Sequence, residues 1–94
     1  MFGEENNMIH ELKIKKEYFE KVRDGQKRFE IRKDDRNYKV GDSIILREID
    51  DSSFQTGNRI ECKILYILKD FDGLKHGYVI LSILETWRNI IYDN

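Results

Sequence analysis

The sequence predicts one small domain of the mixed α/β class, mainly β, in which five short strands and one early helix build a curled or closed sheet. Three observations support this fold class. The 94 residues suffice for one modest core but not for two. In several stretches apolar and polar residues alternate, which is the period of a half-buried strand. Gly, Asp, Ser and Asn cluster between these stretches as turn signals.

The first expected strand and the helix come early in the chain. Residues 10–14 alternate, with His10 on the same side as the two apolar residues that follow. Residues 16–24 form the helix, because apolar side chains recur there at three- and four-residue spacing. These side chains are Tyr18, Phe19 and Val22. Gly25 stands where a C-terminal cap is expected.

The stretch around which the chain is organised is the expected strand at residues 27–33. Phe29 and Ile31 alternate there with charged residues, so we expect both to pack on the core. The other face then carries three charged side chains about 7 Å apart, Arg28, Glu30 and Arg32. A carboxylate between two guanidiniums gives a cationic surface with one fixed acceptor. The alternative is an ordinary salt-bridged, solvated face.

Three more strands are expected after a charged connection that ends in a turn at residues 40–42. They span residues 43–49, 59–68 and 78–84, and polar loops at 50–58 and 70–77 separate them. In the longest of these strands five side chains are expected on one face, namely Ile60, Cys62, Ile64, Tyr66 and Leu68. Residues 85–94 fit either a helical turn or a strand extension.

These elements divide the chain into a flexible leader at residues 1–7, a domain at 8–84 and a C-terminal extension at 85–94. The main competing fold is a ferredoxin-like α+β sandwich. That fold needs a second helix between the later strands, and the sequence offers none.

The charge distribution limits the classes of partner. The chain has 17 basic and 18 acidic residues, so bulk electrostatic attraction to nucleic acid is not expected. Between Lys13 and Lys39, however, the sequence contains eleven basic residues and only six acidic ones. An anionic partner is therefore expected to meet the first half of the domain.

Cysteine and histidine usage predicts a cytoplasmic protein without metal or cofactor. Cys62 has no partner for an intramolecular disulfide, and it alternates with isoleucines as a buried structural thiol does. One cysteine and two histidines without ligand-like spacing do not predict a metal site. The sequence contains no signal peptide and no apolar run long enough to span a membrane.

The run Gly25-x-Lys27-x-x-Glu30-x-Arg32 resembles the G-x-K-x-x-E-x-R signature of ASCH domains, a branch of the PUA-like superfamily. A wider set of blocks, from His10 to Leu81, resembles DUF3850, a family of small ASCH-like proteins of bacteria and phage. The resemblance covers about residues 8–84. It implies a small PUA-like β-barrel with a cleft beside the first helix.

This resemblance implies an RNA- or nucleotide-binding module. ASCH domains are proposed to bind RNA or modified nucleotides in the cleft, which Lys27, Glu30 and Arg32 would line. Four further residues match the narrower family and extend the expected site, namely His10, Lys13, Asp35 and Arg36. Arginines can fork onto phosphate, and Glu30 can accept an amino proton from a base. Tyr38 or Tyr78 is expected either to stack on a base or to pack in the core, and His10 is either a cleft residue or a satisfied core histidine.

Two other functions stay open. Some ASCH proteins hydrolyse N4-acetylcytidine with a lysine, a threonine nucleophile and a glutamate, and Lys27 matches the lysine. Glu30 occupies the position of the threonine, so a binding module is favoured over an enzyme, and Lys27 with Glu30 is the only catalytic pair to consider. The third possibility is a protein-interaction module that uses Trp87 and the C-terminal tail. The sequence does not predict an oligomeric state.

Overall fold

The computed structural model describes residues 6–91, which contain one α-helix and five strands. In chain order these are β1 (Ile9–Lys15), α1 (Lys16–Arg23), β2 (Phe29–Lys33), β3 (Ser43–Ile49), β4 (Gln55–Leu68) and β5 (Tyr78–Asn89). The mainly β class with one early helix is confirmed. The leader predicted at residues 1–7 lies mostly outside the described residues.

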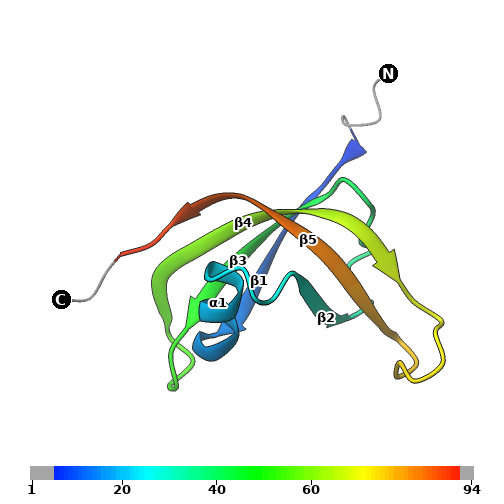
Figure 1. The fold of residues 1–94 in the computed structure, drawn as a ribbon, viewed down its shortest axis with the longest axis horizontal. Coiled ribbons are helices and arrows are strands. Elements are labelled where there is room, and N and C mark those ends of the chain that lie inside the picture. Colours follow the sequence, from blue (N-terminus) through cyan, green and yellow to red (C-terminus); the bar gives the residue numbers. More distant parts are fainter. Residues whose placement is uncertain (1–5, 92–94) are drawn as a thin grey trace.

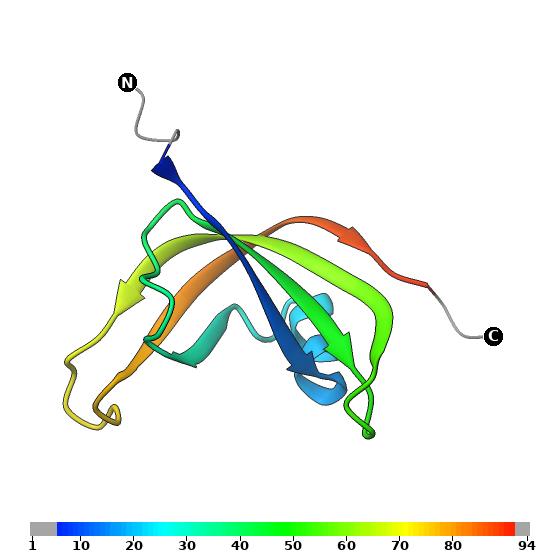
Figure 2. The same ribbon diagram turned by 180° about the vertical axis from the view of Figure 1, so that it is seen from behind.

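The five strands form one strongly curled sheet in the order β1-β3-β4-β5-β2. β1 runs parallel to β3, and the other neighbouring strands are antiparallel. The sheet arches over α1 (Figures 1 and 2). In the described part of the chain β1 and β2 are edge strands that do not pair with each other, so the sheet is a half-barrel and not a closed barrel.

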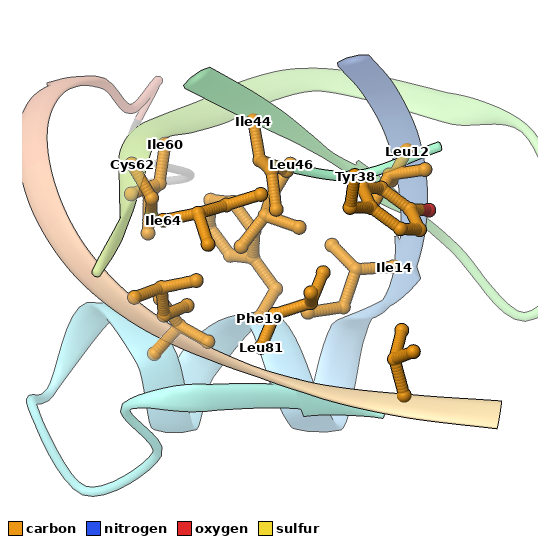
Figure 3. Packing of buried hydrophobic residues seen from close by; sticks show 13 residues of the cluster. Leu12, Ile14, Phe19, Tyr38, Ile44, Leu46, Ile60, Cys62, Ile64 and Leu81 are labelled. Atoms are coloured by element: carbon orange, nitrogen blue, oxygen red, sulfur yellow. The ribbon is translucent and has the colours of Figure 1, made fainter. Parts of the chain in front are cut away.

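The core lies inside the arch, between the strands and α1 (Figure 3). Phe19 of α1 is 1% exposed and reaches the inward side chains of β3 and β4, including Ile44, Leu46 and Ile60. From β1, Leu12 and Ile14 join the same cluster as predicted. α1 is thereby fixed against the concave face of the sheet.

The predicted orientation of β2 is wrong. Phe29 and Ile31 are 42% and 52% exposed, whereas Glu30 is 3% exposed. The register with β5 explains the reversal, because Glu30 lies opposite Leu81, whose side chain is fully buried. Directly opposed residues share a face of the sheet. The charged face of β2 is therefore the inward face.

β4 departs from the predicted pattern at both ends. Its pairing with β5 shifts between Ile64 and Tyr66, and this bulge turns Tyr66 outward to 60% exposure instead of into the core. β4 also begins at Gln55, inside the predicted 50–58 loop. Bulges bend a strand and increase its twist, which suits a sheet that curls this strongly.

The C-terminal part of the domain is a strand extension and not a helical turn. β5 continues past Leu84 to Asn89 and pairs there with the first half of β4. No second helix appears between the later strands of residues 6–91, which disagrees with a ferredoxin-like sandwich.

Candidate functional site

A groove of about 700 Å³ lies between the end of β1, one face of α1 and β2. Five basic residues line it, and they are Lys13, Lys15, Lys21, Lys27 and Arg32. The other lining residues are Ile14, Tyr18, Gln26, Phe29, Glu30, Ile31 and Ile49. The groove therefore combines apolar and aromatic walls with a clear excess of positive charge, although the whole chain has a net charge of −1.

The end of α1 brings Lys27 into this groove. Gly25 has a φ of +77°, a conformation that glycine adopts without strain, and it terminates the helix as predicted. The backbone amides of Gln26 and Lys27 both donate to the carbonyl oxygen of Lys21, at 2.9 and 3.0 Å. This turn folds the chain back along the helix, so that β2 starts beside α1.

Glu30 is the centre of an ion cluster in the groove. Its Oε1 accepts hydrogen bonds from Arg32 Nε at 2.9 Å and Arg32 Nη2 at 2.7 Å. Its Oε2 accepts one from Lys27 Nζ. A buried carboxylate is costly unless it is paired and hydrogen-bonded, and here both of its oxygens are satisfied. The three side chains together carry one net positive charge.

Lys27 also lies between two aromatic rings. Its Nζ is 4.9 Å from the centre of the Phe29 ring and 5.9 Å from that of Tyr18, and it donates to the Phe29 carbonyl at 2.7 Å. Both rings are partly exposed in the groove. A cation at this distance is attracted to the face of an aromatic ring. Lys27 thus links the ion cluster to the aromatic wall.

Two arginines connect the edges of the half-barrel. Arg32 Nη2 donates to the Lys13 carbonyl at 2.9 Å, and Arg36 Nη1 donates to the Glu11 carbonyl at 3.1 Å. Both carbonyls belong to the edge strand β1. The gap between β1 and β2, which we call the seam, is therefore bridged by side chains where a closed barrel would have backbone hydrogen bonds.

The structure brings together four of the seven predicted site residues. Lys13, Lys27, Glu30 and Arg32 line the groove. Asp35 and Arg36 lie outside the groove, where both are exposed beyond the end of β2. Arg36 Nε is 3.9 Å from Asp35 Oδ1.

His10 has a structural environment. Its Nε2 is 2.8 Å from Asp42 Oδ2, both residues are buried, and its ring centre is 4.8 Å from that of Tyr38, which packs in the core. Asp42 also accepts hydrogen bonds from the amides of Met8 and Lys39, each at 3.0 Å. Burial alone would raise the pKa of Asp42, but the hydrogen bonds from His10 and the two amides hold that pKa below its usual value.

Several residues of the groove were not predicted as site residues. The apolar periodicity predicts that Tyr18 and Phe29 face the core, and it gives no site role to Lys15, Lys21 or Gln26. Tyr18 and Lys21 are three residues apart on the helix, which places them on one face. That spacing is the signal that identifies them. Tyr78 lies under Lys75, at 5.5 Å, away from the groove.

Cys62 is a buried structural thiol, as predicted. Burial raises its pKa to about 12, and the nearby carboxylates of Glu85 and Glu30 act in the same direction. A thiol with this pKa is almost entirely protonated near neutral pH, so Cys62 is a poor nucleophile.

Residues 6–91 contain neither a cluster of metal ligands nor a membrane-spanning helix. No group of three or more His, Cys, Asp or Glu side chains is placed there to hold a metal ion. Nor does any helix of that range combine the length and apolar character that crossing a membrane requires.

Comparison with known proteins assigns this half-barrel with its basic groove to a family. The family model described as "Domain of unknown function (DUF3850)" matches residues 9–83, and the chain belongs to that family. The chain is also similar to the "Uncharacterized 12.9 kDa protein in GpA 3'region" of Escherichia phage P2. The two are 44% identical over 73 residues, which cover 78% of this chain and 65% of the phage protein.

Proposed function

We propose that this protein is an RNA- or nucleotide-binding module of the ASCH type, with a PUA-like fold, and that the ligand occupies the groove. The observation that carries the proposal is the placement of the partly exposed rings of Tyr18 and Phe29 among lysines of β1 and α1. Bases of single-stranded RNA stack on aromatic side chains, and phosphates pair with cations. The groove offers both interactions within one volume.

The exposed lysines are the natural phosphate contacts. Lys13 and Lys15 project from β1 and Lys21 from α1, so positive charge flanks the aromatic wall on two sides. Each is a compact charge on a flexible stem that can follow a phosphate position. This arrangement supports recognition of the ligand's backbone by charge and of its base by stacking.

Glu30 and Arg32 have a supporting role in this proposal. Both oxygens of Glu30 accept hydrogen bonds from Lys27 and Arg32, so the carboxylate holds these two cations in place and does not read a base edge. Arg32 is further engaged with the Lys13 carbonyl. The ion cluster therefore preorganises the groove and gives it a fixed positive potential.

The alternative of a small hydrolase for modified nucleosides has less support. Among the described residues that line the groove there is no serine, threonine or cysteine to serve as nucleophile. Lys27 and Glu30 already neutralise each other within the ion cluster. The geometry favours binding.

The test is a titration of the protein with short single-stranded RNAs and nucleotides at two salt concentrations. We expect the double variant Lys15→Glu/Lys21→Glu to weaken RNA binding at least tenfold. We also expect a weaker salt dependence. The slope of the logarithm of the binding constant against the logarithm of the salt concentration should become shallower by about 0.7 for each lost phosphate contact. RNA binding by the wild type that persists unchanged in this variant would place the ligand elsewhere.

The matched control is Lys39→Glu/Lys69→Glu, which changes the net charge equally. Both lysines are exposed and neither lines the groove. We expect this control to bind within about twofold of the wild type at moderate salt. Equal weakening in both variants would mean that overall charge, and not the groove, attracts RNA.

A further inference from the structure

A second cavity, of about 360 Å³, lies on the other side of Lys27. It is formed by the end of α1, the turn that follows it, and the facing parts of β4 and β5. Its lining includes four basic residues, namely Arg23, Lys27, Arg28 and Arg88. Asp24 and Glu85 are the acidic residues among its lining, so positive charge is again in excess.

The basic side chains of this cavity are held in place by hydrogen bonds. Arg28 Nε donates to the Gly25 carbonyl at 3.1 Å, which ties the guanidinium to the turn. Arg88 donates to Glu85 through Nε and Nη2, at 2.6 and 2.7 Å, and its Nη2 also reaches the Arg23 carbonyl at 2.9 Å. These contacts join the end of β5 to the end of α1 and fix the rim of the cavity.

Lys27 lines both the groove and the second cavity. The two hollows are therefore neighbours that share Lys27, and basic residues line both of them. The aromatic rings Tyr18 and Phe29 line the groove only. One hollow thus offers stacking and charge, and the other offers mainly arginines.

We propose that the two hollows form one continuous binding track for single-stranded RNA, and that the second cavity holds a backbone phosphate of a nucleotide next to the one in the groove. This inference rests on the proposed function and deepens it. Arg28 suits this task because a guanidinium can donate paired hydrogen bonds to phosphate oxygens. The guanidiniums of Arg23 and Arg88 pair with Asp24 and Glu85 and form the rim of the cavity. The ligand is then a segment of several nucleotides and not a free nucleotide.

The test compares two probes, a mixture of the four nucleoside 5′-monophosphates and a randomised single-stranded RNA octamer. Wild-type protein is expected to bind the octamer at least tenfold more tightly than the monophosphates. Arg28→Glu is expected to weaken octamer binding at least fivefold while monophosphate binding stays within twofold. Lys69→Glu, with the same change in charge, serves as control and is expected to leave both affinities within twofold.

The outcomes separate this inference from the proposed function. Equal affinity for both probes, or octamer binding that Arg28→Glu leaves unchanged, overturns the track and leaves a groove that binds one nucleotide. No binding of either probe by folded protein at low salt overturns both proposals. Circular dichroism of Arg28→Glu shows that the variant is folded. If it is not, Arg28→Ala, which leaves the turn without an added carboxylate, gives the same comparison.

Discussion

The hydrogen-bonded ion pairs of Glu30 explain why the inward face of β2 can carry a charge. The Glu30 carboxylate is 3% exposed, and burial of such a group without partners costs several kcal/mol. Lys27 and Arg32 supply three hydrogen bonds to it, and each of these cations keeps a partly exposed side on the groove. The cost of burying one charge is thereby offset within a cluster that presents positive charge to the groove.

At the same scale, the exposure of Phe29 leads to a prediction about stability. Because the ring is 42% exposed, Phe29→Ala should lower the free energy of unfolding by about 1.5 kcal/mol or less, from partial burial and the contact with Lys27. Phe19→Ala, at a site 1% exposed, should cost about 3–5 kcal/mol. Urea unfolding of the two variants measures the difference. A loss of stability for Phe29→Ala as large as that for Phe19→Ala would mean that the Phe29 ring packs in the core.

At the scale of elements, Asp42 connects the start of β1 to the start of β3. It accepts hydrogen bonds from His10 and the Met8 amide on one side and from the Lys39 amide on the other. The pairing of Ile9 with Ser43 begins beside these contacts. The parallel arrangement of β1 and β3 is thus anchored by one buried carboxylate.

The lowered pKa of Asp42 predicts acid sensitivity. A carboxyl whose pKa is lower in the folded state than its ordinary 3.8 stabilises the fold at pH values above 3.8, and this contribution is lost as the pH falls through the folded pKa. Asp42→Asn should cost about 1.5–3 kcal/mol at pH 7, because several donors lose a charged acceptor. Urea midpoints between pH 7 and pH 3 should fall less steeply for the variant. A parallel fall in both proteins would assign the acid sensitivity to other carboxyls.

The elements that the sequence predicts well are those in which apolar residues recur at a regular spacing. In β1, Leu12 and Ile14 alternate with charged residues, and in α1 Phe19 and Val22 recur at helical spacing, so periodicity identifies these buried side chains. β2 alternates too, but hydrophobicity favoured Phe29 and Ile31 as the core residues. The register with β5 decides otherwise, and nothing within the strand reports that register. The bulge in β4 is equally invisible in its apolar pattern.

The candidate site was predicted in part for a similar reason. The signature Gly25-x-Lys27-x-x-Glu30-x-Arg32 identified the ion cluster, because its members lie within one short stretch. Lys15, Tyr18 and Lys21 were missed because they line the groove only once the end of α1 turns back along β2. Helical spacing places Tyr18 and Lys21 on one face of α1, but only the tertiary structure brings that face beside β2.

At the scale of the whole molecule, the groove lies at the seam between the two edges of the half-barrel. β1 supplies lysines to one wall, and β2 with the turn before it supplies Phe29 and the ion cluster to the other. The same Arg32 that pairs with Glu30 also bridges the seam to Lys13. A ligand bound here contacts both edges, so we expect binding to stabilise the fold as well.

The last prediction tests whether Arg32 holds the seam by geometry or by charge alone. Arg32→Lys keeps the charge, but a single ammonium does not reproduce the planar fork that reaches both Glu30 and the Lys13 carbonyl. We expect a loss of about 1–2 kcal/mol in the free energy of unfolding, since charge-assisted hydrogen bonds are lost in a partly buried cluster.

Arg36→Lys, at the second arginine that bridges the seam, is the matched control for Arg32→Lys. Its side chain is 47% exposed and donates a single hydrogen bond to the Glu11 carbonyl, so the same substitution should cost less than about 0.5 kcal/mol. Urea unfolding at low and high salt separates the contribution of charge from that of hydrogen-bond geometry. Salt screens the attraction between charges, but it has less effect on the loss of the paired guanidinium hydrogen bonds. Equal and salt-sensitive losses in both variants would mean that the edges are held by charge, and the geometric role of Arg32 would be withdrawn.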